Sequence, residues 1–345
     1  MFLIRRQPGV SFCALLMTLL LTACGGGSGG AAVGTAPPPT EPAASGVVAP
    51  PSTPSSGVPE PTPDPTTGCT GDDASSVRTN VFLLLNLVRT TVGLSPFVRD
   101  TALDTAAQAH ARYSATNNHA GQDEQPDRPC FTGATLAERL AGAGVTVPDQ
   151  ANVRVRSEVM LGYDVPANAE LPPWDAVNYM LHSLYGRVFL LDARMRDLGV
   201  GGSGLPGSAK RTLVLDAALL ADTPPTPAAT YAFWPRDGAT SLPAQMQRSD
   251  MKPLEAGVVE GYPASIHAAA PVQVSRFVMT RATDGGAVDA TLITAANDRN
   301  GVLDSGEAAL VPNAPLAAGT TYRVELDATL ADQPLHLAWS FTTAP

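Results

Sequence analysis

Three side chains in the sequence are candidates for acid–base chemistry: His119, Glu158 and His182. A carboxylate beside an imidazole can accept a proton from a substrate and return it, so a hydrolase could use Glu158 with His182 or with His119. The sequence has no phosphate-binding glycine-rich loop, no His-Glu-x-x-His motif and no dinucleotide fingerprint around Gly199–Gly202. No cofactor is therefore expected.

A loop in the C-terminal third of the chain resembles part of a calcium-binding EF-hand loop. Its candidate ligands, arranged around Gly301, are Asp298, Asn300, Asp304 and Glu307. The first ligand position holds Ala296, and no helices are expected to flank the loop. A polar hairpin loop explains the same residues, so both interpretations stay open and no metal is assigned.

The N-terminus has the order of a secretory signal. Arg5 and Arg6 precede an apolar run, Phe12–Leu21, which is too short to span a bilayer as a helix. The ending Leu21-Thr22-Ala23-Cys24 resembles the bacterial lipobox, which implies cleavage after residue 23 and lipidation of Cys24. We therefore expect an exported protein with a lipid membrane anchor. Because Gly25 follows the cysteine, the expected destination in a Gram-negative host is the outer membrane.

Two of the four cysteines are left for the globular part of the chain, Cys69 and Cys130. Outside the cytoplasm such a pair is expected to form a disulfide, which leaves no thiol for catalysis. Residues 24–68 are rich in Pro, Gly and Ser and predict a disordered tether. The net charge is −10 without a Lys/Arg-rich stripe, so no nucleic acid is expected as a partner.

The spacing of apolar residues predicts helices mixed with short strands over residues 69–222. Asp100 is a suitable N-cap, and Thr135 with Glu138 forms a predicted capping box. Helices are expected around 77–88, from Asp100 to Tyr113, after Thr135 and over Trp174–Leu191, and strands at Leu198–Val200 and Thr212–Leu215. Such a mixture is typical of a layered α/β/α domain.

Several short motifs follow one another over residues 80–202. They are Asn86–Arg89, Gly93–Pro96, Ala106–Tyr113, Phe131–Thr135, Leu190–Asp192 and Leu198–Gly201. Together they resemble the bacterial secreted branch of the CAP superfamily, the SCP-like group named for cysteine-rich secretory, antigen 5 and pathogenesis-related proteins. The resemblance implies a CAP-type α-β-α sandwich for residues 69–222.

The same resemblance implies a cavity that commonly holds two histidines and two glutamates able to bind zinc. Carried over to this sequence, the four positions are Gln122, Glu158, Ser183 and Gly186. Glu158 alone is retained, and one carboxylate does not make a zinc site. His182 lies one helical turn before Gly186, and His119 lies three residues before Gln122. These two histidines with Glu158 are the candidates for a displaced site.

Residues 223–228 are expected to be a linker, and residues 229–345 an all-β domain. Period-two alternation predicts strands at Val272–Met279, Tyr322–Leu326 and Leu335–Phe341. The motifs Trp234–Thr240, Pro315–Tyr322 and Trp339–Thr343 resemble bacterial Ig-like modules of cell-surface proteins. The fold expected for the chain is thus α+β: a CAP-type sandwich followed by an Ig-like sandwich.

These features favour a cell-envelope lipoprotein whose degenerate CAP domain is a non-catalytic binding or scaffold module. Its expected partners are the membrane, through the anchor, and an envelope polymer, lipid or protein. The alternatives are a metal-assisted or acid/base hydrolase that uses Glu158 with His182 or His119, and a spacer that binds nothing small.

Overall fold

The computed structural model describes residues 2–5, 68–145, 154–163, 172–208, 210–220, 226–227, 229–246, 251–255 and 257–345. For 2–5 and 154–163 it describes the backbone alone. The expected lipidation site, Cys24, lies outside these residues, as does most of the tether and of the linker. None of the helices in the described part is long and apolar enough to cross a membrane.

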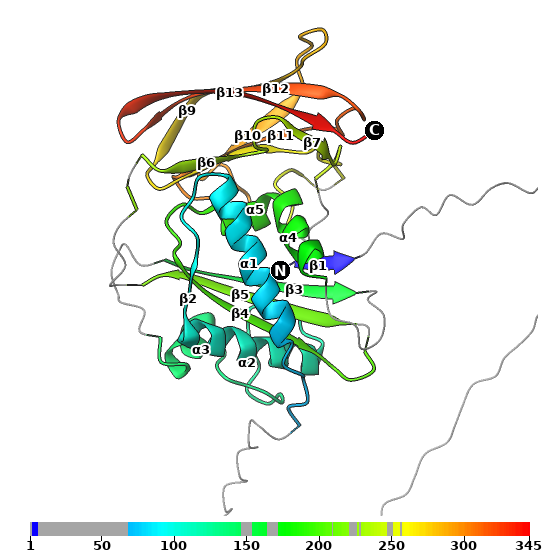
Figure 1. The fold of residues 1–345 in the computed structure, drawn as a ribbon, viewed down its shortest axis with the longest axis vertical. Helices are drawn as coiled ribbons and strands as arrows, with labels where there is room; N and C mark the ends of the chain where they lie inside the picture. The colour runs from blue at the N-terminus through cyan, green and yellow to red at the C-terminus, as the bar shows by residue number, and fades with distance from the viewer. Residues whose placement is uncertain are drawn as a thin grey trace, which may run out of the picture. The chain divides into compact units, whose positions relative to one another are not determined.

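The first domain has a central sheet with helices on both faces (Figure 1). The helices are α1 Ser75–Thr91, α2 Thr101–Asn117, α3 Leu136–Gly142, α4 Pro173–His182 and α5 Leu184–Leu191. The strands are β1 Phe2–Arg5, β2 Val98–Arg99, β3 Arg154–Tyr163, β4 Asp197–Gly204 and β5 Arg211–Leu219, in the order β1-β3-β5-β4-β2. The strand β1 comes from the predicted signal segment and pairs in parallel with β3.

Glycines in β4 show which helix covers which face of the sheet. A Cβ atom on Gly201 would lie 2.1 Å from the carbonyl oxygen of Ala107 in α2, so only glycine allows this close approach. The neighbouring Gly202 points toward Ala74 and Arg78 at the start of α1. Helices α1, α4 and α5 therefore cover one face, and α2 with α3 covers the other (Figure 1).

Local sequence signals account for the helix starts. The carboxylate of Asp100 accepts hydrogen bonds from the backbone N–H groups of Ala102 and Leu103, at 2.9 and 2.8 Å. Thr135 and Glu138 form the predicted capping box at the start of α3. The single helix expected over Trp174–Leu191 is wrong, because the backbone at Ser183 is extended and divides it into α4 and α5.

The predicted disulfide between Cys69 and Cys130 is present. It joins the residues that precede α1 to the loop between α2 and α3. With a sequence separation of 61 residues, it limits the unfolded chain enough to stabilise the fold by about 4 kcal/mol.

The C-terminal region is all-β, as expected, and consists of two four-stranded sheets. Its strands are β6 Tyr231–Trp234, β7 Ala239–Leu242, β8 Ala264–Ala268, β9 Val272–Arg281, β10 Ala290–Thr294, β11 Glu307–Pro312, β12 Thr321–Leu330 and β13 Gln333–Thr343. The sheet orders are β10-β11-β8-β6 and β7-β13-β12-β9. One continuous cluster of buried side chains contains residues of α1, α4 and α5 together with residues of both β sheets.

Candidate functional site

A fully buried hydrogen-bonded pair of a histidine and a carboxylate joins α2 to the loop that follows it. Nδ1 of His110 lies 2.8 Å from Oε1 of Glu124, and both side chains are fully buried. Nε2 of His110 lies 3.1 Å from the carbonyl oxygen of Gly121. The other oxygen of Glu124 accepts a hydrogen bond from the N–H of Thr132, at 2.6 Å. Because both ring nitrogens of His110 have partners, the pair fixes the loop and leaves no nitrogen for a metal.

The same loop carries the first position of the implied CAP cavity. The carbonyl oxygen of Gln122 accepts a hydrogen bond of 2.7 Å from Nη1 of Arg139 in α3. Burial, opposed by the charge of Glu124, lowers the pKa of Arg139. His119 lies three residues earlier, with its Nε2 atom 3.4 Å from Oδ1 of Asp123. Gln122 and His119 therefore belong to the face of the sheet that α2 and α3 cover.

The last two cavity positions, Ser183 and Gly186, lie on the opposite face, at the junction of α4 and α5. Both residues are buried. A Cβ atom on Gly186 would lie 2.6 Å from the Cα atom of Met180. No side chain fits there without displacing backbone, so the histidine that the family resemblance places at this position is sterically excluded.

His182 ends α4 and contacts the second domain. Its Nδ1 atom lies 2.8 Å from the hydroxyl of Tyr262, which also accepts a hydrogen bond of 2.8 Å from Nε1 of Trp234. Burial, reinforced by the charge of Arg187, lowers the pKa of His182 to about 4. The imidazole is therefore neutral at pH 7 and a weak base.

A buried arginine completes the contact between the domains. The Arg187 guanidinium donates to the carbonyl oxygens of Leu181 and Pro263 at 2.5 and 2.7 Å, and lies 4.7 Å from the ring centre of Tyr262. Burial lowers the pKa of Arg187 and raises that of Tyr262. Residues of the second domain thus occupy the space beside the α4–α5 junction.

The structure does not bring the candidate acid–base residues together. His119 follows α2 on one face of the sheet, and His182 ends α4 on the other (Figure 1). The backbone of Glu158 lies in β3, opposite Leu215 of β5, while its side chain lies outside the described part of the structure. One metal ion cannot bind both histidines in this arrangement.

The calcium candidates are divided between two contacts with the first domain. Asp298 accepts hydrogen bonds from its own turn, including the N–H of Val302 at 2.7 Å, and from the hydroxyl of Tyr185 in α5 at 2.6 Å. The side-chain amide of Asn300 donates to the same hydroxyl at 2.6 Å. Burial, and then the hydrogen bond to Asp298, raise the pKa of Tyr185. These two residues therefore fix the loop against α5.

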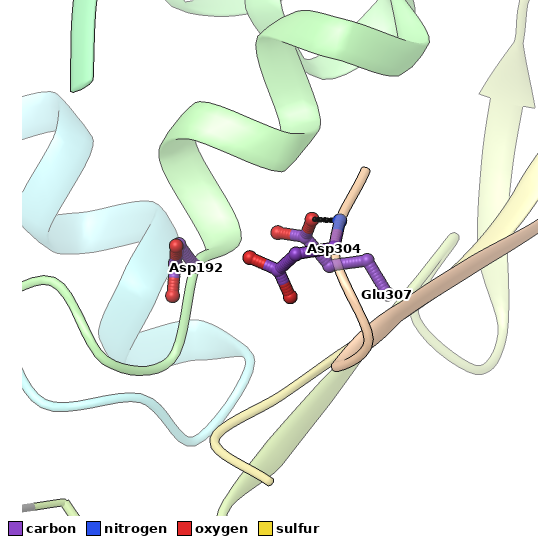
Figure 2. Close-up of side chains that lie close together, drawn as sticks. All are labelled: Asp192, Asp304 and Glu307. Carbon is purple, nitrogen blue, oxygen red and sulfur yellow. Dashed lines mark hydrogen bonds between the residues drawn. The ribbon is translucent and has the colours of Figure 1, made fainter. Parts of the chain in front are cut away.

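The other two candidates, Asp304 and Glu307, meet Asp192 at the end of α5 (Figure 2). Oxygen atoms of the three carboxylates lie within 4.8 Å of one another. The guanidinium of Arg194 lies 2.9 Å from Asp192, 2.6 Å from Asp304 and 3.9 Å from Glu307. An arginine thus provides the positive charge that a cation would bring, and the cluster is an ion-paired contact between the domains.

Several residues of these contacts were not predicted from the sequence. Arg187 stands in the apolar run of α5, and a charge in such a run is a recognisable sign of a buried, hydrogen-bonded group. Glu124 lies in a polar stretch and Tyr262 beside a proline, where no local pattern reveals their partners. Asp192 and Arg194 are distant in sequence from the loop that they contact.

The fold and these contacts define an α-β-α sandwich packed on a β sandwich. Residues 82–205 match the model of the CAP family, described as the cysteine-rich secretory protein family. This match agrees with the family that the sequence motifs indicated for the first domain. A comparison with curated protein sequences finds no match.

Two solved structures are similar to part of the chain. One is an outer surface protein from Borrelia burgdorferi, at 12% identity and a TM-score of 0.34, covering 44% of this chain and 97% of its own. The other is an extracellular protein with an SCP domain from Bacillus anthracis, at 21% identity and a TM-score of 0.31. That match covers 41% of this chain and 40% of the Bacillus chain.

Proposed function

We propose that the protein is an exported, lipid-anchored envelope protein whose CAP domain is a non-catalytic binding or scaffold module. One observation carries the proposal: Gln122 and the pair Ser183 and Gly186 lie on opposite faces of the central sheet. None of these three positions holds a histidine or a carboxylate. The domain therefore keeps the fold of the family but only one of the four implied metal ligands, Glu158.

Export and anchoring are supported by the sequence and by the disulfide. Cys24 ends a lipobox-like sequence, and a segment rich in Pro, Gly and Ser follows it. The disulfide between Cys69 and Cys130 is typical of compartments outside the cytoplasm. The matched family is described as secretory.

The anchor is tested by comparing Cys24→Ala with Cys13→Ala. Both changes remove a cysteine from the N-terminal segment, but only the first removes the acceptor of the lipid. We expect the first variant to appear in the soluble fraction and the second to stay with the membrane after a high-salt wash. Retention of Cys24→Ala on the membrane would contradict lipid anchoring.

The binding role is tested with isolated envelope fractions, namely cell-wall polymer, lipid vesicles and membrane protein. We expect saturable binding of the purified full-length chain to one of these fractions. The same preparation is assayed for ester, peptide and glycoside hydrolysis, beside Glu158→Gln and the exposed control Glu255→Gln. Hydrolysis that is lost in Glu158→Gln and kept in Glu255→Gln would show an enzyme and overturn the proposal.

A further inference from the structure

A small pocket lies between the C-terminal end of α2 and the hairpin that joins β4 to β5. Its volume is about 200 Å³. Its polar lining consists of Ser114, Thr116, Asn118, Ser208, Lys210 and Thr212. The pocket is on the α2 side of the sheet and is separate from the domain contacts described above.

One of the residues that line the pocket has a buried hydroxyl that lacks a partner. Ser114 is fully buried, and its Oγ atom has no hydrogen-bond partner among the described residues. A serine inside a helix can donate to the carbonyl four residues earlier, which Ser114 does not do. An unpaired buried hydroxyl costs about 1–3 kcal/mol, so a polar group that enters the pocket would relieve this cost. Thr212 of β5 adds a second, largely buried residue with a hydroxyl to the lining.

The mouth of the pocket carries a positive charge. Nζ of Lys210 donates a hydrogen bond of 2.7 Å to the side-chain oxygen of Asn118, the left-handed residue that caps the C-terminus of α2. None of the lining residues is acidic, although the chain as a whole has a net charge of −10. The carbonyl oxygens of Ser114 and Ala115, near the C-terminal end of α2, accept hydrogen bonds from the backbone N–H groups of His119 and Asn118. These hydrogen bonds reduce the partial negative charge at this end of the helix.

We propose that this pocket binds a small oxyanion, the carboxylate or phosphate group of a ligand. Lys210 supplies the positive charge, and the hydroxyls of Ser114 and Thr212 donate hydrogen bonds to the oxyanion. The inference rests on the proposed binding role and deepens it, because it names the site and the chemistry of the ligand. A hydroxyl-lined pocket of this volume holds a carboxylate or phosphate group together with the atoms bonded directly to it. The rest of the ligand would lie outside the pocket.

The sequence offers an internal control, because Lys210 and Lys252 are its only two lysines. The full-length chain is treated with a lysine-acylating reagent, and the rate of modification at each lysine is followed by mass spectrometry. Inorganic phosphate or acetate is added at constant ionic strength, with chloride as the balancing anion. We expect saturable protection of Lys210 by one of the two oxyanions, while the rate at Lys252 stays unchanged. The protecting probe identifies the oxyanion class.

A hydroxyl-deletion variant tests the lining of the pocket. Ser114→Ala should weaken protection of Lys210 about tenfold, the cost of one hydrogen bond to a charged group. Thr212→Val provides a second deletion if the first variant folds poorly. The proposal is overturned if neither probe protects Lys210, if both lysines are protected alike, or if both deletions keep full protection. Envelope binding without protection of Lys210 would reject this pocket and keep the proposed function. Protection of Lys210 without envelope binding would keep the pocket and reject the proposed function.

Discussion

Nδ1 of His182, the last residue of α4, lies 2.8 Å from the hydroxyl of Tyr262 in the second domain. The same hydroxyl accepts a hydrogen bond from Trp234, and the ring of Tyr262 lies against the Arg187 guanidinium. One end of the CAP domain thus belongs to a buried polar network shared with the β sandwich. Breaking this network should therefore affect the stability of both domains.

The stability of the protein should depend on pH through His182. Burial and the charge of Arg187 lower the folded-state pKa to about 4, against an unfolded value of about 6.5. Between these two pKa values the unfolded chain therefore binds more protons than the folded chain. The contribution of His182 to the unfolding free energy is complete above pH 6.5 and is lost as pH falls toward 4. Its size is at most about 3 kcal/mol.

The check is chemical denaturation of the full-length chain between pH 4.5 and 7, a window set by the two pKa values. His182→Asn, which keeps a polar group near the Nδ1 position, should show a smaller loss of unfolding free energy on acidification than the wild type. His336→Asn, at an exposed histidine, should follow the wild type. Identical slopes for all three proteins would show that His182 is not buried against Tyr262.

Removal of Arg194 should destabilise the protein and create a cation site. Arg194→Ala removes the guanidinium that pairs with Asp192, Asp304 and Glu307, whose oxygen atoms lie within 4.8 Å of one another, at a cost of about 3 kcal/mol. Calcium should raise the melting temperature of this variant and leave the wild type unchanged, because the guanidinium competes with the ion. A wild type that calcium stabilises as strongly as the variant would contradict the ion-paired arrangement. Arg323→Ala, at an exposed arginine, is the control.

Gly186 should not tolerate even one added methyl group. Alanine usually favours a helix by about 1 kcal/mol over glycine, but a Cβ atom here would meet Met180 at 2.6 Å. We expect Gly186→Ala to lower the unfolding free energy by about 2 kcal/mol. In the matched control Gly142→Ala, the nearest atom to the new Cβ lies 3.8 Å away, so that variant should be as stable as the wild type or more stable. Equal effects of the two substitutions would refute the close approach of α4 and α5.

Local chemistry made part of the fold predictable. Asp100 begins α2 because its carboxylate accepts the first free N–H groups, and Thr135 with Glu138 does the same for α3. These interactions involve neighbouring residues, so the sequence pattern contains them. The strands of the C-terminal domain with period-two alternation, β9, β12 and β13, were predicted for the same reason.

Contacts between distant residues were not predictable. No proline marks the break at Ser183, where an extended backbone separates α4 from α5 and Gly186 lies close to Met180. The candidate site depends on similar contacts: Arg139 binds the loop at Gln122, and Tyr262 is 80 residues beyond His182. Residue types indicated that three of the four ligands of the implied cavity were lost, but only the fold shows that Gln122 lies on the opposite face of the sheet from Ser183 and Gly186.

The most direct test of the account is a calorimetric titration of the metal-free full-length chain with zinc. Because His119 and His182 lie on opposite faces of the central sheet, we predict no binding at micromolar affinity, about −8 kcal/mol. Micromolar binding that is lost in both His119→Gln and His182→Gln would contradict the account, since it would show that the two histidines share a metal site.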